Sequence, residues 1–138
     1  MIELSARTLY GVAAVFELSC RHGSGPCRVA EISEKHDIPR NYLDQILLEL
    51  KKADLAVSHR GVNGGYTLGK EPANISVWDV IKVLEGGVNL TRAIDVKSDT
   101  LRKYWREAQS RLESDFDKNF EELRVEWQKR QGSLNYSI

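Results

Sequence analysis

Apolar residues recur at helical intervals in the first part of the chain, with polar residues between them. In residues 5–21 the apolar positions advance by 3, 1, 3 and 4 residues, at Leu9, Val12, Ala13, Phe16 and Cys20. This is the period of one face of an α-helix. The pattern predicts a helix over 5–21 that is capped by Ser5 and buries these five side chains.

A short helix and a longer helix follow, separated by a tight turn. The pattern places the short helix at 29–36 and the turn at residues 37 and 38. Pro39 suits the first turn of the next helix, because the N–H that proline lacks has no intrahelical partner there. We expect that helix to reach Ala53, where Asp54 can adopt the left-handed conformation that ends it. Its buried face is predicted to be Leu43, Ile46, Leu47 and Leu50.

The next stretch changes from the period of a helix to that of a strand. Residues 55–59 and 66–68 are typical of strands, and the glycine-rich residues 61–65 between them indicate a hairpin. A further helix is predicted to begin at Ser76, which has capping-box spacing to Asp79, and to end at the two glycines 86 and 87.

The last third of the chain combines a polar connection with a long helical pattern. Residues 88–98 have no clear periodicity, whereas apolar residues recur at helical intervals from Leu101 to Trp127. Asn119 followed by Glu122 resembles a new helix cap, which predicts a break near residues 117–119. Residues 132–138 show no helical pattern.

The order of these elements is that of a winged helix-turn-helix, so the predicted fold class is mainly α with a small β-hairpin wing. The second helix of such a unit fits the major groove of DNA, and its outer N-terminal face offers side chains that read base edges. These are Arg40, Asn41, Asp44 and Gln45. At the hairpin tip, His59, Arg60 and Asn63 can contact a minor groove or phosphates. Taken one at a time, the same residues also fit a solvated helix face and an ordinary turn.

Composition narrows the class of function. The 20 basic and 20 acidic residues cancel, so binding to a nucleic acid must rest on local charge. The N-terminus has no signal-peptide pattern and no apolar run approaches a membrane span, which predicts a cytoplasmic protein. The three histidines lie in separate elements, and no nucleophile–base pair indicates an enzyme.

Several motifs resemble the Rrf-two family of bacterial transcription regulators. They are the stretch Tyr-Leu-Asp-Gln at 42–45, the wing Arg-Gly-Val-Asn-Gly-Gly-Tyr at 60–66, and Ile-Ser-Val-Trp-Asp-Val-Ile at 75–81 followed by Leu-Glu-Gly at 84–86. The family includes an iron–sulfur cluster regulator, nitric-oxide-sensing repressors and the cysteine metabolism repressor. The resemblance covers about residues 1–130 and implies a homodimeric winged-helix protein that binds double-stranded DNA.

The resemblance also implies site residues beyond those of the helix face and wing. It adds Tyr42 to the reading helix and assigns phosphate contacts at the N-terminal helix to Ser5, Arg7 and Tyr10. Arg28 stands where the family usually has a small polar helix cap, so a cap is lost and a cation that can reach a phosphate is gained.

Residues 86–98 correspond to the sensor loop of the family, where cluster-binding relatives carry three cysteines. This chain has no cysteine there, so no cluster, metal or other cofactor is expected. The subgroup that fits best is the cysteine metabolism repressor. Cys20 is expected to be a small core residue. Cys27 is expected to be exposed in a turn, where it is either an inert thiol or a redox sensor with a lowered pKa.

Residues 99–138 are predicted to form a dimerisation helix and a tail. Leu101, Trp105, Ala108 and Leu112 make an apolar stripe, which either mediates a two-fold dimer or packs on its own domain. In the tail, Tyr136 and Ile138 are candidate contacts for O-acetylserine thiol-lyase, an enzyme that regulates the cysteine metabolism repressor. A terminal isoleucine offers it one aliphatic side chain and one carboxylate.

These observations support two hypotheses about function. The first is a sequence-specific repressor that binds a palindromic operator as a dimer, with control of cysteine or sulfur metabolism as the implied role. The second is a winged-helix module that binds another protein instead of DNA.

Overall fold

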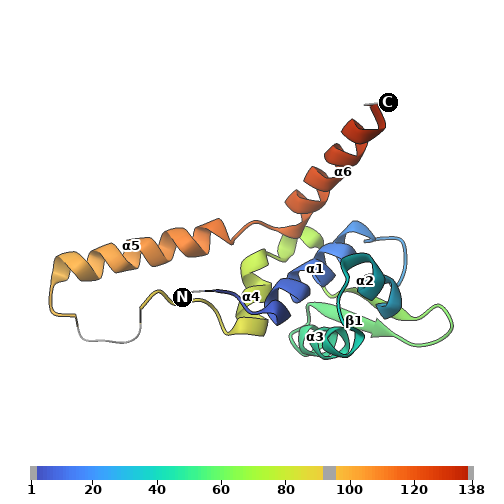
Figure 1. The fold of residues 1–138 in the computed structure, drawn as a ribbon, viewed down its shortest axis with the longest axis horizontal. Coiled ribbons are helices and arrows are strands. Elements are labelled where there is room, and N and C mark those ends of the chain that lie inside the picture. Colours follow the sequence, from blue (N-terminus) through green and yellow to red (C-terminus); the bar gives the residue numbers. More distant parts are fainter. Residues whose placement is uncertain (1–2, 92–95, 137–138) are drawn as a thin grey trace.

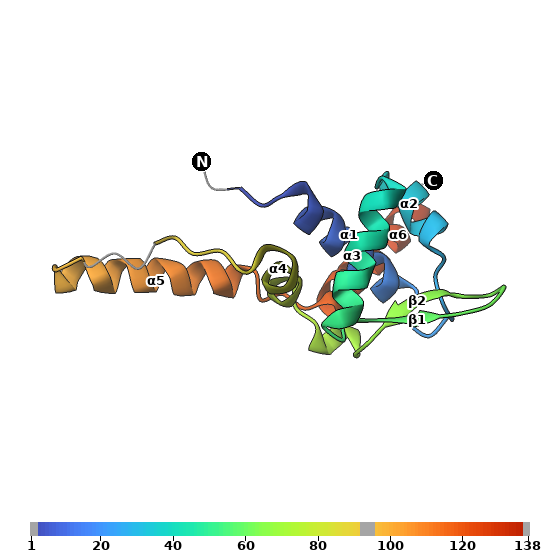
Figure 2. The same ribbon diagram turned by 90° about the horizontal axis from the view of Figure 1, so that it is seen from below.

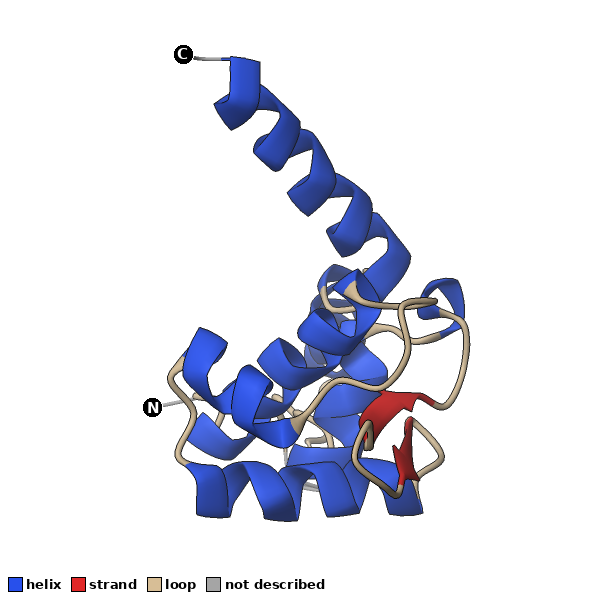
Figure 3. Ribbon diagram, turned by 90° about the vertical axis from the view of Figure 1, so that its right-hand side faces the viewer, coloured by secondary structure: helices blue, strands red, loops and turns tan. Residues whose placement is uncertain are grey.

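The computed structural model describes residues 3–91 and 96–136 of the chain, and these form helices with one two-stranded hairpin (Figures 1 and 3). The elements are α1 (Ala6–Cys20), α2 (Val29–His36), α3 (Arg40–Lys52), β1 (Ala56–His59), β2 (Gly65–Leu68), the 3-10 turn η1 (Pro72–Asn74), α4 (Val77–Glu85), α5 (Asp99–Asp115) and α6 (Phe120–Tyr136). The predicted fold class is confirmed. Within this described part, no helix is long and apolar enough to cross a membrane.

Helices α1, α3 and α4 enclose the hydrophobic core together with the start of α6. The predicted inner face of α3, from Leu43 to Leu50, is fully buried, and so is Phe120 at the start of α6. Asp37 adopts the left-handed conformation between α2 and α3, and the following Ile38 is buried. This turn sets the two helices of the helix-turn-helix at their angle.

The buried face of α1 differs from the predicted stripe. Leu9 is 55% exposed, and Val12, Ala13 and Phe16 are only half-buried at the edge of the core. The buried residues are Thr8, Gly11, Ala14, Val15, Glu17, Leu18 and Ser19. Many of these residues are small, which lets α1 approach α4 so closely that a Cβ on Gly11 would lie 2.0 Å from Leu84 Cδ1.

The hairpin pairs Ala56 with Leu68 and His59 with Gly65 in antiparallel register. A third segment joins its edge: the N–H of Cys27 donates to the carbonyl of Tyr66, and the N–H of Tyr66 donates to the carbonyl of Cys27. The wing is thereby attached to the segment that precedes α2. Figure 2 shows it projecting from the helical body on the side opposite α5.

The predicted caps and breaks of the second half are confirmed. Ser76 and Asp79 form a reciprocal capping box, and Gly86 ends α4 in the left-handed conformation. The helical pattern breaks at residues 117–119, where Asn119 Oδ1 accepts from the N–H of Glu122. Helix α5 then points away from the body in one direction and α6 in another (Figure 1).

The prediction that residues 132–138 are not helical is wrong as far as Tyr136, because α6 continues to that residue. Apolar periodicity reports which face of a helix is buried, and this last stretch of α6 lacks it. A helix that has already formed nonetheless extends at low cost. Ile138 lies outside the described residues, so the predicted contact with O-acetylserine thiol-lyase stays a prediction.

Candidate nucleic-acid interface

The outer face of α3 presents the four predicted base-reading residues to solvent. Arg40, Asn41, Asp44 and Gln45 are all exposed, while the opposite face of the helix is buried in the core. Arg40 Nε lies 3.7 Å from Asp44 Oδ1, one helical turn away. Because that pair is exposed, it is weak and can open when a base or phosphate offers a better partner.

The N-terminus of α3 faces the wing across an open groove of about 530 Å³. Arg28, Arg40 and His59 line it from three separate segments. The structure thus brings together three side chains that were predicted to contact DNA and that lie up to 31 residues apart in the sequence. A groove lined in this way suits a phosphate backbone.

Arg28 also holds the wing in place. Its Nη2 donates to the carbonyl of Val62 at the wing tip, at 2.9 Å, and its side chain makes no helix cap, as predicted. The tip extends into solvent: Val62 is 88% exposed, and Arg60 and Asn63 are exposed beside it. His59 Nε2 lies 2.8 Å from Thr67 Oγ1, an interaction that braces the base of the tip.

The residues predicted from the N-terminal helix lie in a different environment. Ser5 caps α1 and its N–H donates to Glu85 Oε1, while Arg7 Nη1 donates to the carbonyl of Leu84. Both are therefore engaged with the C-terminal end of α4. Tyr10 is half-buried, and its ring lies 6.4 Å from that of the exposed Tyr42, which joins α1 to the reading helix.

Both cysteines lie in environments that differ from the predicted ones. Cys27 was expected to be exposed, but it is 1% exposed and belongs to the core, because pairing with Tyr66 turns its side chain inward. Burial raises the pKa of the Cys27 thiol, which opposes the lowered pKa that a redox sensor needs. Cys20 was expected to be a core residue but is only half-buried. Burial together with Glu17 raises the pKa of its thiol as well.

The predicted dimer stripe lies on α5, none of whose residues is buried. Leu101 and Trp105 are exposed, whereas Ala108 and Leu112 are half-buried. Sequence reasoning missed Tyr104, which is exposed next to the stripe and meets the Trp105 ring edge-on at 5.2 Å. Its position outside the strict apolar period is the reason it was missed.

Together, the helix-turn-helix, the exposed α3 face and the basic groove to the wing define a winged helix-turn-helix protein of the DNA-binding class. The Rrf2 family, described as "Iron-dependent Transcriptional regulator", matches residues 4–123. The chain belongs to the Rrf2 (Rrf-two) family, as its motifs indicated. It is a DNA-binding transcriptional regulator and not an enzyme.

Proteins that are similar in sequence agree with this assignment. The chain is 34% identical over 104 residues to the HTH-type transcriptional regulator CymR of Bacillus subtilis, covering 75% of each chain. It is 37% identical over 91 residues to IscR of Cronobacter sakazakii, covering 66% of this chain and 56% of that one. The match therefore spans only about half of the length of the C. sakazakii protein.

Solved structures show the same fold over nearly the whole chain. CymR, described as the global cysteine regulator of B. subtilis, superposes with a TM-score of 0.83 at 31% identity and covers 91% of this chain and 98% of its own. IscR of T. potens has a TM-score of 0.78 at 29% identity and covers 94% and 91%.

The family description implies iron, but the residues of this chain do not fit an iron–sulfur cluster. Such clusters are held by cysteine thiolates, and residues 86–98 contain none. Cys20 and Cys27 lie in the helical body and are too few. In the ranges that the structure describes, no three His, Cys, Asp or Glu side chains are grouped so as to hold a metal ion.

Proposed function

We propose that this protein is a homodimeric repressor that binds a palindromic operator through α3 and the wing. The observation that carries the proposal is the groove in which Arg28, Arg40 and His59 converge beside the exposed face of α3. In the proposed complex, Gln45 and its neighbours contact base edges in the major groove. Arg60, Asn63 and the groove residues contact phosphates or the minor groove.

The proposed dimer rests on α5. A helix that projects from the body with Leu101 and Trp105 exposed gains by pairing with a second copy. A two-fold axis through that pair would present two α3 helices to successive half-sites of a palindrome.

We further propose genes of cysteine or sulfur metabolism as the targets and the cytoplasm as the site of action. The support is the similarity to CymR, whose described role is cysteine regulation, combined with the lack of cluster ligands. DNA binding places a bacterial regulator in the compartment of the chromosome.

The experiment begins with footprinting of genomic DNA by the purified protein, to obtain an operator, and continues with gel-shift titrations over single-base operator variants. Gln45→Ala is expected to relax preference at one position per half-site by about 1–3 kcal/mol, because it removes a base-edge contact. Gln128→Ala, an exposed glutamine of α6, is the matched control and should change nothing.

Arg60→Ala is expected to act differently. It should weaken binding to all sequences alike, because one phosphate contact is lost. For the same reason the negative slope of log K against log salt should become shallower by about 1. Lys70→Ala removes an exposed cation at the other end of the wing and serves as control. If neither Gln45→Ala nor Arg60→Ala changes affinity, this face does not bind DNA. Salt-insensitive binding would favour the protein-interaction module.

A further inference from the structure

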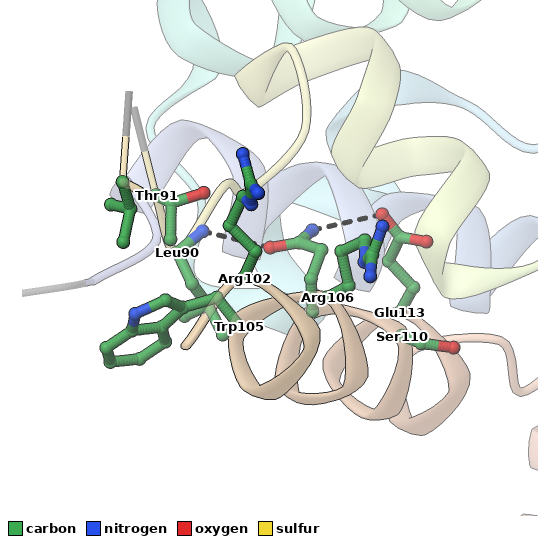
Figure 4. A pocket seen from close by; sticks show the side chains of 9 residues that line it. Leu90, Thr91, Arg102, Trp105, Arg106, Ser110 and Glu113 are labelled. Atoms are coloured by element: carbon green, nitrogen blue, oxygen red, sulfur yellow. Dashed lines mark hydrogen bonds between the residues drawn. The ribbon is translucent and has the colours of Figure 1, made fainter. Parts of the chain in front are cut away.

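Leu48 is a large apolar side chain that the fold leaves in solvent. It is 46% exposed on α3 and is not part of the hydrophobic core. Other exposed apolar side chains, such as Trp105, extend from α5 (Figure 4), where the proposed dimer would cover them. Leu48 is on a different helix, so the α5 interface does not account for its exposure.

Leu48 continues the row of side chains that the proposed function assigns to base reading. Four exposed residues of α3 follow one another at intervals of 3, 1 and 3 residues: Asn41, Asp44, Gln45 and Leu48. Residues with this spacing lie on one face of a helix, and homeodomains read the major groove with a row of the same spacing. The row is about 10 Å long, which matches the rise of about three base-pair steps of DNA. Leu48 can therefore face the same groove as Gln45.

The row combines polar and apolar chemistry. The amides and the carboxylate of its first three residues match hydrogen-bond donors and acceptors on base edges. Thymine differs from the other bases by the C5-methyl group that it presents in the major groove, and apolar side chains are the ones that contact this methyl group. The Leu48 side chain ends in two methyl groups and has no polar atom that would need a partner beside it.

The ion pairs next to Leu48 leave its side chain accessible. Arg40 Nε lies 3.7 Å from Asp44 Oδ1, so this pair is on the turn before Leu48. Lys52, one turn after Leu48, points its Nζ to Glu49 Oε1 at 3.8 Å. Neither pair spans Leu48, so neither has to open before a base can contact it.

We propose that Leu48 recognises the C5-methyl group of one thymine in each half-site of the operator. This assignment rests on the proposed function, because it requires α3 to lie in the major groove. The polar residues of the row read the hydrogen-bonding pattern of the bases, and Leu48 adds a contact that depends on the methyl group alone.

The test compares thymine with uracil, which differs from it in duplex DNA only by lacking the C5-methyl group. Once footprinting has given an operator, deoxyuridine replaces each thymidine of one half-site in turn, and fluorescence anisotropy measures the affinity of the protein. We expect a position at which the replacement weakens binding about fourfold, the effect of one buried methyl group. At this position Leu48→Ala should bind both operators with affinities in a ratio of about 1, because the side chain that contacts the methyl group is gone.

Two further variants separate base reading from a structural role of Leu48. Leu48→Met keeps an apolar side chain of similar volume, and its thymine-to-uracil ratio of affinities should stay at about twofold or more. Lys52→Ala changes an exposed residue one turn later on the same helix and is the matched control. Its ratio should remain at about fourfold, whatever its effect on overall affinity.

Two results would overturn this assignment and leave the proposed function intact. One is an operator that the protein binds equally well whichever thymine of the half-site is replaced. The other is a methyl effect of the same size in Leu48→Ala, which would assign the methyl group to a different residue. If the unmodified protein binds no DNA, the proposed function and this assignment both fail.

Discussion

Glu17 is a buried charge, 1% exposed, in the middle of α1. Two cations and a histidine surround its carboxylate: Arg21 Nε lies at 2.7 Å, Lys35 Nζ at 3.1 Å and His36 Nε2 at 3.0 Å. Burial by itself would raise the pKa of Glu17, but the hydrogen bonds from Arg21, His36 and Lys35 outweigh it and hold the pKa below its ordinary value of 4.5. The cluster fixes α2, the first helix of the helix-turn-helix, to α1.

Glu17→Gln is expected to lower the free energy of unfolding by about 1–3 kcal/mol at pH 7, because it removes charge-assisted hydrogen bonds from a buried site. The loss stays below that of a fully buried pair, since Arg21 and Lys35 can turn to water. Urea denaturation measures it. Glu34→Gln, an exposed carboxylate on α2, is the control and should stay within about 0.5 kcal/mol of the parent protein.

The same cluster gives the stability of the protein a pH dependence with a definite sign. Because the folded-state pKa of Glu17 lies below 4.5, its stabilising effect is fully present above pH 4.5 and is lost as the pH falls through the folded-state value. The stability difference between the parent and Glu17→Gln should therefore shrink below pH 4.5. A difference that stays constant down to the acid transition would contradict the assignment.

At the scale of the element, the wing depends on one close backbone approach. Gly65 has φ +151°, and a Cβ there would lie 2.2 Å from the carbonyl oxygen of Cys27. That contact is where the hairpin joins the segment before α2. A side chain at Gly65 would force β2 away from the segment that contains Cys27, and it would thereby move the tip of the wing away from Arg28.

Gly65→Ala is expected to cost about 2–3 kcal/mol of stability, because it adds a backbone clash to conformational strain. Gly61→Ala is the matched substitution: Gly61 has φ +106° but open space around it, so only the strain remains, about 1 kcal/mol. Thermal unfolding of the two variants compares them. Equal losses would mean that the wing does not depend on the Cys27–Tyr66 pairing.

At the scale of the whole molecule, α5 and α6 project from the helical body in different directions (Figure 1). Helix α6 begins inside the core at Phe120, where its N–H donates to the carbonyl of Ile75. Helix α5 buries no residue. Residues 86–98 connect α4 to α5 in the sequence. In the proposed dimer, α5 pairs with its copy and so connects the two DNA-binding units.

Leu112→Glu is expected to weaken dimerisation by about 3 kcal/mol or more, because it places an unpaired charge on the proposed interface. Ser114→Glu adds the same charge two residues later, on the opposite side of α5, and should leave the dimer intact. Sedimentation velocity distinguishes the two. A Leu112→Glu variant that remains dimeric would place the interface elsewhere.

The sequence by itself determined the elements and most of their ends, apart from the C-terminal end of α6. The helices, the hairpin, the capping box at Ser76 and the break before Asn119 follow from side chains acting within a few residues of each other. Such local interactions depend less on the tertiary setting than contacts between distant segments do. The exposed face of α3 was predictable for a related reason. Its four leucine and isoleucine residues on one side must face the core, so the other side of the helix must face solvent.

Only the tertiary structure decided contacts between distant segments. The close approach of α1 to α4 buries Thr8 and Gly11 and leaves Leu9 in solvent, which the apolar pattern of α1 could not reveal. Likewise, Cys27 is buried because a strand 39 residues away pairs with its backbone, and Arg7 is engaged by the end of α4. Burial and side-chain pairing depend on which surfaces meet, and no local spacing contains that information.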